Sequence, residues 1–147
     1  MRNTKNVAAA ILTLAMWIIP AIASGQSFKV IVNDNNSTAS MSKENLSKCF
    51  LKQMRLWNNG IPVIAVDQAT NSVTRKAFSE EIHDRDVSAI KSFWQRQIFS
   101  GRGVPPTEKA TDEEVLIFVN SNTGAVGYVS VDTDLGTGVK VLEIADQ

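Results

Sequence analysis

The chain has 147 residues, of which 44% are apolar and 20% are charged, and its 15 basic side chains balance its 15 acidic ones. This length is sufficient for one domain with a sizeable apolar core, and the balanced charge argues against a nucleic-acid-binding surface. One cysteine excludes an intramolecular disulfide, and one histidine leaves no zinc pattern or Ser-His-Asp set to assemble. We therefore expect no metal and no cofactor.

Residues 1–23 have the pattern of a secretory signal. Two cations precede an apolar run over 7–19, and the Ala-Ile-Ala sequence at 21–23 is a small-x-small cleavage site. The run is shorter than the roughly 20 apolar residues that a membrane span needs. We expect cleavage after Ala23, or alternatively after Gly25, with an uncleaved anchor as the other possibility. Because residues 1–23 contain two cations and no acid, cleavage after Ala23 leaves 124 residues with a net charge of −2.

A strand and a helix are the first elements predicted after the signal. The run 28–32 is rich in β-branched residues, which favours a strand, and a polar loop follows it. Ser42 is suited to cap a helix over about 43–53. One face of that helix carries Leu46, Cys49, Phe50 and possibly Gln53. There we expect Cys49 to be a buried, inert thiol, with a reactive thiol as the alternative.

The next unit is a turn, a strand, a second turn and a helix. An Asn-Gly pair marks a turn at 57–60, and the apolar run 61–66 predicts the strand. The polar turn 67–72 then opens into a helix over about 73–82. The apolar stripe of this helix is supplied by Ala77, Phe78 and Ile82.

A third helix is predicted after Asp86, following a polar loop that contains His83. The spacing of three and four residues that marks a core face is shown by Val87, Ile90, Phe93, Trp94, Gln97 and Ile98. At this spacing the Phe93-Trp94 pair favours core packing over a ligand platform. The glycines and prolines of the loop 100–106 end the helix.

The last part of the chain predicts a helix between strands. Thr111 and Glu114 match a capping box ahead of an apolar run. Strands are expected at 124–129 and 139–144. Strands that alternate with helices predict an α/β fold, with a mainly parallel or mixed central sheet flanked by helices.

The start of the second helix is the candidate binding site. Ser72, Thr74, Arg75 and Lys76 lie there, where backbone N–H groups lack helical partners and the helix dipole is positive. Hydroxyls and cations in such a turn can hold a small oxyanion, and ligands of α/β sheets bind beside strand ends. The alternative is that Asn71 or Ser72 simply caps the helix and the cations are solvated.

Six segments in order, from Phe28 to about Val129, resemble the second lobe of the periplasmic phosphate-binding proteins of ABC transporters, and in particular short exported members of that type-2 periplasmic-binding-protein superfamily. The segments are 30–33, 46–51 with its Cys-Phe-Leu, 57–63 with its Trp, Gly and Pro, 72–78, the Gly-x-Gly-x-Pro-Pro loop at 99–106, and the Gly-Ala-Val-Gly-Tyr-Val strand at 124–129. The resemblance implies a non-enzymatic, periplasmic protein that binds phosphate or a related small oxyanion.

The resemblance also implies which residues would hold the anion. Full-size members read Gly-Ser-Gly-Thr in this turn, and Ser72 and Thr74 stand at the hydroxyl positions. Asn71 and Val73 replace the glycines, which let a backbone approach a ligand closely. An arginine that clamps phosphate in full-size members is replaced by Gln68, and Thr70 stands where they often carry an acid. The implied site is therefore Ser72, Thr74 and Arg75, with Gln68 and Asn71 lining the turn and Lys76 and Arg102 as weaker candidates.

Length is the largest departure from the family. Full-size members close two lobes around phosphate, whereas one lobe leaves the ligand in contact with water, where hydrogen bonds add little net affinity. We expect affinity on the order of millimolar unless a partner or a second copy completes the site. The alternative function is an exported interaction or sensory module that kept the lobe, lost the ligand and docks on an envelope protein. An enzyme that uses Ser72 as nucleophile lacks an evident base.

Overall fold

The computed structural model describes residues 25–145. The predicted signal at 1–23 and the cleavage site after Ala23 lie outside the described residues. No helix within 25–145 is long and apolar enough to cross a membrane.

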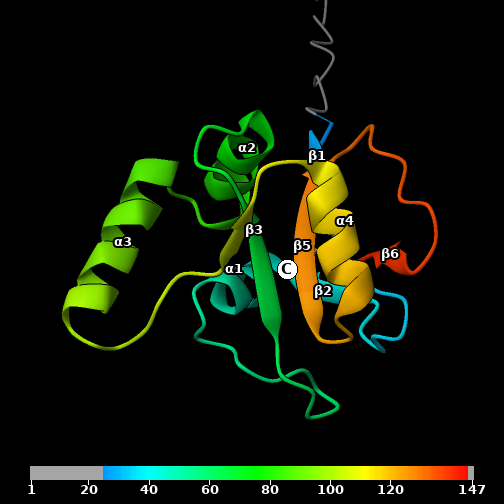
Figure 1. Ribbon diagram of the computed structural model, residues 1–147, viewed down its shortest axis with the longest axis horizontal. Coiled ribbons are helices and arrows are strands. Elements are labelled where there is room, and N and C mark those ends of the chain that lie inside the picture. The colour runs from blue at the N-terminus through cyan, green and yellow to red at the C-terminus, as the bar shows by residue number, and fades with distance from the viewer. Residues whose placement is uncertain (1–24, 146–147) are drawn as a thin grey trace, which may run out of the picture.

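A mixed five-stranded sheet forms the centre of the fold (Figure 1). Its strand order is β4-β3-β5-β1-β6, and a second sheet pairs β2 with β7. The strands are β1 (Phe28–Asn33), β2 (Ser40–Ser42), β3 (Ile64–Gln68), β4 (Thr107–Lys109), β5 (Ala125–Ser130), β6 (Val139–Val141) and β7 (Glu143–Ala145). The helices are α1 (Lys43–Phe50), α2 (Val73–Ile82), α3 (Val87–Phe99) and α4 (Asp112–Ser121). β3 runs parallel to both β4 and β5, whereas β1 is antiparallel to β5 and β6. The predicted α/β fold with a mixed central sheet is confirmed.

The two faces of the sheet carry separate apolar layers because side chains alternate along each strand. Val30 and Tyr128 face α1 and α2, and Ile31 and Val129 face α4. Gly127 lies under α4, where a Cβ atom would come within 2.7 Å of a methyl group of Val66. Its lack of a side chain therefore lets α4 pack closely on β5.

Aromatic rings fill the layer beneath α1 and α2. The rings of Phe78 and Tyr128 stack with centroids 3.9 Å apart, and Phe28 and Phe50 pack against them. All four side chains are fully buried. The predicted apolar stripe of α2 is thus the contact that fixes this helix on the sheet.

Each helix begins at a polar residue that caps it. The side-chain oxygens of Ser42, Ser72, Asp86 and Thr111 each accept a hydrogen bond from the backbone N–H three residues ahead. Such caps contribute about 1 kcal/mol each. The predicted caps of α1 and α4 are therefore confirmed, and so is capping at the start of α2.

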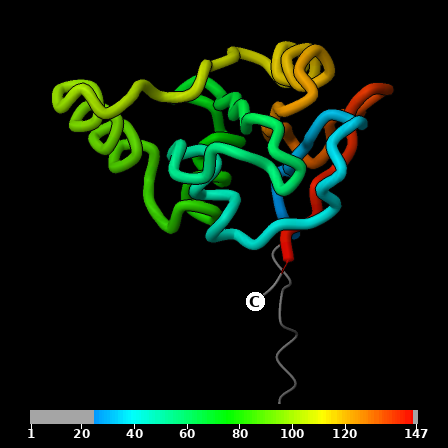
Figure 2. Tube along the Cα trace, turned by 90° about the horizontal axis from the view of Figure 1, so that it is seen from below, coloured from blue at the N-terminus to red at the C-terminus, as the bar shows by residue number. Residues whose placement is uncertain are grey.

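α3 stands at the side of the molecule, away from the sheet (Figures 1 and 2). Only Ile90 and Trp94 of this helix are buried, whereas Ile98 and Phe99 are exposed. The prediction that one continuous face of this helix packs in the core is therefore wrong at its C-terminal end.

Three predicted element bounds also differ from the structure. α1 ends at Phe50, because the backbone at Lys52 turns left-handed (φ 56°), and Gln53 is consequently exposed and not part of the helix face. β3 starts at Ile64, since Pro62 instead pairs with Leu56 in an isolated bridge, and it continues to Gln68, so that Asp67 and Gln68, predicted in the turn, lie in the strand. The last predicted strand divides at Leu142, whose N–H bonds to Val30, so that β6 joins β1 and β7 joins β2. Two short strands, β2 and β4, were not predicted.

Candidate functional site

The candidate site is the turn over 69–72, which joins the carboxyl end of β3 to the start of α2. Two backbone hydrogen bonds shape this turn: Ala69 N–H donates to the carbonyl of Lys109, and Ser72 N–H donates to the carbonyl of Ala69. The turn therefore lies beside the end of the parallel pair β3–β4, the kind of strand end where α/β sheets bind ligands.

Ser72 is both the cap of α2 and the central polar group of the turn. Its Oγ accepts a hydrogen bond from Arg75 N–H at 3.2 Å and donates one to Gln68 Oε1 at 2.5 Å. The backbone N–H groups of Val73 and Thr74 have no hydrogen-bond partner among the described residues. Two amide donors at the positive end of a helix dipole are thus available for an anion.

Arg75 points away from the open side of the turn. Its side chain is 6% exposed, and its guanidinium lies 3.2 Å from Asp67 Oδ2 and 2.7 Å from Glu108 Oε1. It also donates to the carbonyl oxygen of Gln68. Arg75 was predicted to bind the oxyanion, but its guanidinium is already paired with two carboxylates. Arg75 joins α2 to the ends of β3 and β4.

Asp67 and Tyr128 form the buried floor beneath this ion pair. The Tyr128 hydroxyl donates a hydrogen bond to Asp67 Oδ1, which also accepts from Gln68 N–H at 3.0 Å. Burial raises the pKa of Asp67 in spite of the neighbouring Arg75. Burial, together with the Asp67 charge, also raises the pKa of Tyr128, which stays protonated as a donor.

Gln68 is also directed inward. Its Nε2 donates to Asp112 Oδ1 at 2.8 Å and to the Tyr128 carbonyl at 3.0 Å, and its Oε1 receives the Ser72 hydroxyl. The amide is buried and uses both of its polar atoms. Gln68 therefore orients Ser72 and connects the turn to the start of α4.

The open side of the turn borders a cavity of about 360 Å³. From the turn and α2 it is lined by Thr70, Asn71, Ser72, Val73, Lys76 and Glu80, and across it lie Asp86, Val87 and Ser88. Lys76 is the one cation in this lining. Half-buried Thr74 and exposed Arg102 do not line this cavity, and Arg102 borders another one.

Of the residues around the turn, Asp67, Glu108 and Tyr128 were not predicted. An acid at the end of an apolar strand was a signal for Asp67, because such an acid is rarely buried without a partner. Glu108 carried no signal, since β4 is three residues long and its pairing with β3 depends on the whole topology.

The one cysteine and the one histidine of the chain have structural roles. Cys49 is buried, as predicted, and burial raises the pKa of its thiol to about 11. His83 caps the C-terminal end of α2, and its Nδ1 lies 2.8 Å from Ser47 Oγ. Burial lowers the pKa of His83 to about 4, so the ring is neutral at pH 7. Within 25–145, no three His, Cys, Asp or Glu residues gather as a metal site would need.

Comparison with known proteins gives a fold and no closer relationship. No family model matches the chain, and no curated protein matches it. Among solved structures, an ABC-type phosphate transport receptor from Vibrio cholerae matches with a TM-score of 0.62 and 22% identity, covering 80% of this chain and 46% of the receptor. A putative phosphate ABC transporter substrate-binding protein with bound phosphate from Clostridium perfringens matches with a TM-score of 0.62 and 17% identity, over 80% and 44% of the two chains. A possible phosphate-binding protein from Planctomyces limnophilus matches with a TM-score of 0.61 and 19% identity, over 82% and 42%.

The chain thus spans less than half the length of each of these solved structures. At identities of 22% and below, the likeness concerns the fold. The resemblance drawn from the sequence is confirmed at this level: the chain has the fold of a single lobe of the periplasmic phosphate-binding proteins, with a mixed sheet flanked by helices.

Proposed function

We propose that this protein is an exported, periplasmic, solute-binding-like protein for phosphate or a related small oxyanion, and that the turn at the start of α2 holds the anion. The N–H groups of Val73 and Thr74, which have no partner within residues 25–145, carry this proposal together with the neighbouring Ser72 hydroxyl. The solved structures of this fold support it, because one of them contains bound phosphate. We do not assign it an enzymatic role, because the Ser72 hydroxyl donates its hydrogen bond to the neutral amide of Gln68 and not to a base.

Each residue of the proposed site has a separate role. Ser72 and the amides of Val73 and Thr74 donate to the anion, and Asn71 and Lys76 border it on the open side. The Ser72 hydroxyl has one proton, which it donates to Gln68 Oε1 in the structure, so this proton turns from Gln68 to the anion when the anion binds. Arg75 fixes the turn to β3 and β4 and adds little net charge, because Asp67 and Glu108 offset it.

This site should bind weakly on its own. One cation, two amides and a hydroxyl act on one side of the anion, and water reaches the other, which reduces the net value of each hydrogen bond. We expect a dissociation constant of about 5 mM, so 50 mM phosphate would stabilise the folded protein by about 1.4 kcal/mol. A second copy or a partner that covers the cavity would raise the affinity.

Thermal unfolding in phosphate, sulfate and chloride at matched ionic strength tests the proposal. Matching is needed because salts also stabilise proteins through exclusion from their surface. We expect a saturable rise in melting temperature that is largest in phosphate. Ser72→Ala should lose this rise, and Thr111→Ala, which removes a cap of the same kind from α4, should keep it. Equal responses of the wild-type protein to the three salts would reject the proposal.

The alternative, an exported interaction or sensory module without a ligand, is favoured by one observation. The Arg75 guanidinium is already paired with the carboxylates of Asp67 and Glu108. Two further acids, Glu80 and Asp86, line the cavity beside Lys76. These acids offset the positive charge near the turn, which favours a protein-interaction role over anion binding. Capture of an envelope protein that persists in the Ser72→Ala/Arg75→Lys variant, together with no anion response, would support this function.

A further inference from the structure

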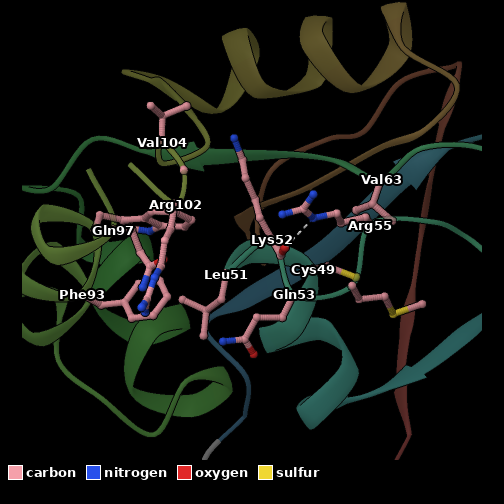
Figure 3. A pocket seen from close by; sticks show the side chains of 13 residues that line it. Cys49, Leu51, Lys52, Gln53, Arg55, Val63, Phe93, Gln97, Arg102 and Val104 are labelled. Atoms are coloured by element: carbon pink, nitrogen blue, oxygen red, sulfur yellow. Dashed lines mark hydrogen bonds between the residues drawn. The ribbon is translucent and has the colours of Figure 1, made fainter. Parts of the chain in front are cut away.

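A second and larger cavity lies between the C-terminal end of α1 and α3, with a volume of about 940 Å³ (Figure 3). Lys52 and Arg55 lie on its α1 side, and Arg102 lies with Phe93 and Gln97 on its α3 side. It exists because α3 stands away from the sheet and leaves Phe93 only half-buried.

The charged residues of this cavity are all basic. Lys52, Arg55 and Arg102 line it, no acidic side chain does, and none of the salt bridges formed within 25–145 involves them. Within the described residues, the Lys52 ammonium donates a hydrogen bond to the carbonyl of Pro105 at 3.4 Å, and Arg55 Nε donates one to the carbonyl of Lys52 at 3.3 Å. These three exposed cations lie on both sides of the cavity and make its lining positively charged (Figure 3). Its complement is an anion.

The cavity also has an apolar surface. The lining includes Leu51, Met54, Phe93 and Trp94, and the two aromatic rings meet edge to face with centroids 5.0 Å apart. Trp94 is buried and Phe93 is half-buried, so both rings are held in place while one presents a free surface. Inorganic phosphate has no apolar part to place there. The volume lies within the roughly 300–1,000 Å³ of small-molecule sites.

We propose that this cavity binds a small organic anion, with an aromatic or branched apolar body against Phe93 and Trp94 and a carboxylate, sulfonate or phosphate group between Lys52, Arg55 and Arg102. None of its lining residues belongs to the turn over 69–72 or to α2. The inference is therefore independent of phosphate binding at the turn, and either site can fail without the other.

A pair of probes tests the two requirements together. The probes are 8-anilinonaphthalene-1-sulfonate and the uncharged N-phenyl-1-naphthylamine, which share their aromatic rings and differ in the sulfonate. Each is titrated into the purified protein, with the probe's own emission and tryptophan emission as readouts. We expect one saturable site per chain for the sulfonate, quenching of Trp94, and affinity about tenfold higher than for the neutral probe.

Single substitutions then locate the site. Arg102→Gln is expected to weaken sulfonate binding three- to fivefold, as is Lys52→Gly. Glycine suits the left-handed backbone at position 52, so Lys52→Gly should fold at least as well as the wild type. Lys91→Gln is the control, because Lys91 is an exposed cation of α3 outside the cavity, and it should change the affinity by less than twofold. Ser72→Ala should also leave sulfonate binding unchanged.

Three outcomes would overturn the proposal. Equal affinity for the two probes would show that the cations take no part. Unchanged binding in both Lys52→Gly and Arg102→Gln would place the probe elsewhere. Light scattering of the same samples addresses the other occupant: a dimer that excludes the sulfonate would show that a second copy of the chain covers this cavity.

Discussion

The ion pair between Asp67 and Arg75 is expected to be the most strongly coupled polar contact of the fold. Their side chains are 8% and 6% exposed, and the closest nitrogen and oxygen are 3.2 Å apart. At an effective dielectric constant of about 20 this distance corresponds to about 5 kcal/mol of attraction, from which the cost of desolvating both groups is subtracted. Arg75→Met leaves Asp67 buried without its counter-ion, so we expect a loss of about 3–4 kcal/mol. Asp67→Asn should cost about 2 kcal/mol, because Arg75 keeps Glu108.

A double-mutant cycle measured by urea unfolding isolates this coupling. The double variant Asp67→Asn/Arg75→Met should lose about 2 kcal/mol less than the sum of the single losses. The control cycle uses Glu44 and Lys48, an exposed pair four residues apart on α1, for which we expect a coupling below about 0.5 kcal/mol. A coupling in the buried cycle as small as that of the control would show that this ion pair does not hold the turn in place.

Three other predictions concern pH, the turn and packing. Burial lowers the pKa of His83 in the folded protein to about 4, below its unfolded value of 6.5, so the free energy of unfolding should fall by up to about 3 kcal/mol as pH drops from 6.5 to 4. His83→Gln should flatten the slope of unfolding free energy against pH, and an unchanged slope would show that burial of His83 does not cause it. The double substitution Asn71→Gly/Val73→Gly should lower the phosphate dissociation constant several-fold in calorimetry while costing about 1 kcal/mol of stability, since Val73 is exposed and only obstructs the approach to its amide. Gly127→Ala should destabilise by about 1–3 kcal/mol in chemical unfolding, because its Cβ meets Val66 and Val115, and a neutral effect would show that α4 can move.

Local signals in the sequence were sufficient for most of the helices and for the sheet class. The caps at Ser42 and Thr111 are single-residue features with a direct hydrogen-bond consequence, and both are confirmed. The bounds of α2 are also confirmed, because its cap and its apolar stripe agree. β4 could not be predicted, since its three residues form a strand only through pairing with β3.

The position of α3 could not be predicted from the spacing of its apolar residues. The spacing of Ile90, Phe93, Trp94 and Ile98 predicts an apolar face but not how much of that face finds a partner. In the structure Ile90 and Trp94 are buried, Ile98 is exposed to solvent, and half-buried Phe93 borders the basic cavity. Helical periodicity alone cannot distinguish a core face from a binding face.

The residue types of the turn were sufficient to select it as a candidate site, but they did not predict the directions in which its side chains point. Gln68 points inward because it donates a hydrogen bond to Asp112. Arg75 points inward because it forms ion pairs with Asp67 and Glu108. Those partners lie up to 44 residues away in the sequence. Without an observed fold, a cation next to a hydroxyl at a helix start is as consistent with an anion site as with a buried ion pair.

The central claim, that the turn binds phosphate through its free amides, is tested most directly by amide NMR. Phosphate is titrated into ¹⁵N-labelled protein at constant ionic strength, with sulfate and chloride as references. We predict saturable shifts that are largest for the N–H groups of Val73 and Thr74, with a dissociation constant of about 5 mM and smaller shifts with chloride. Shifts that are linear in concentration, or that spread over the surface equally for the three anions, would contradict the claim.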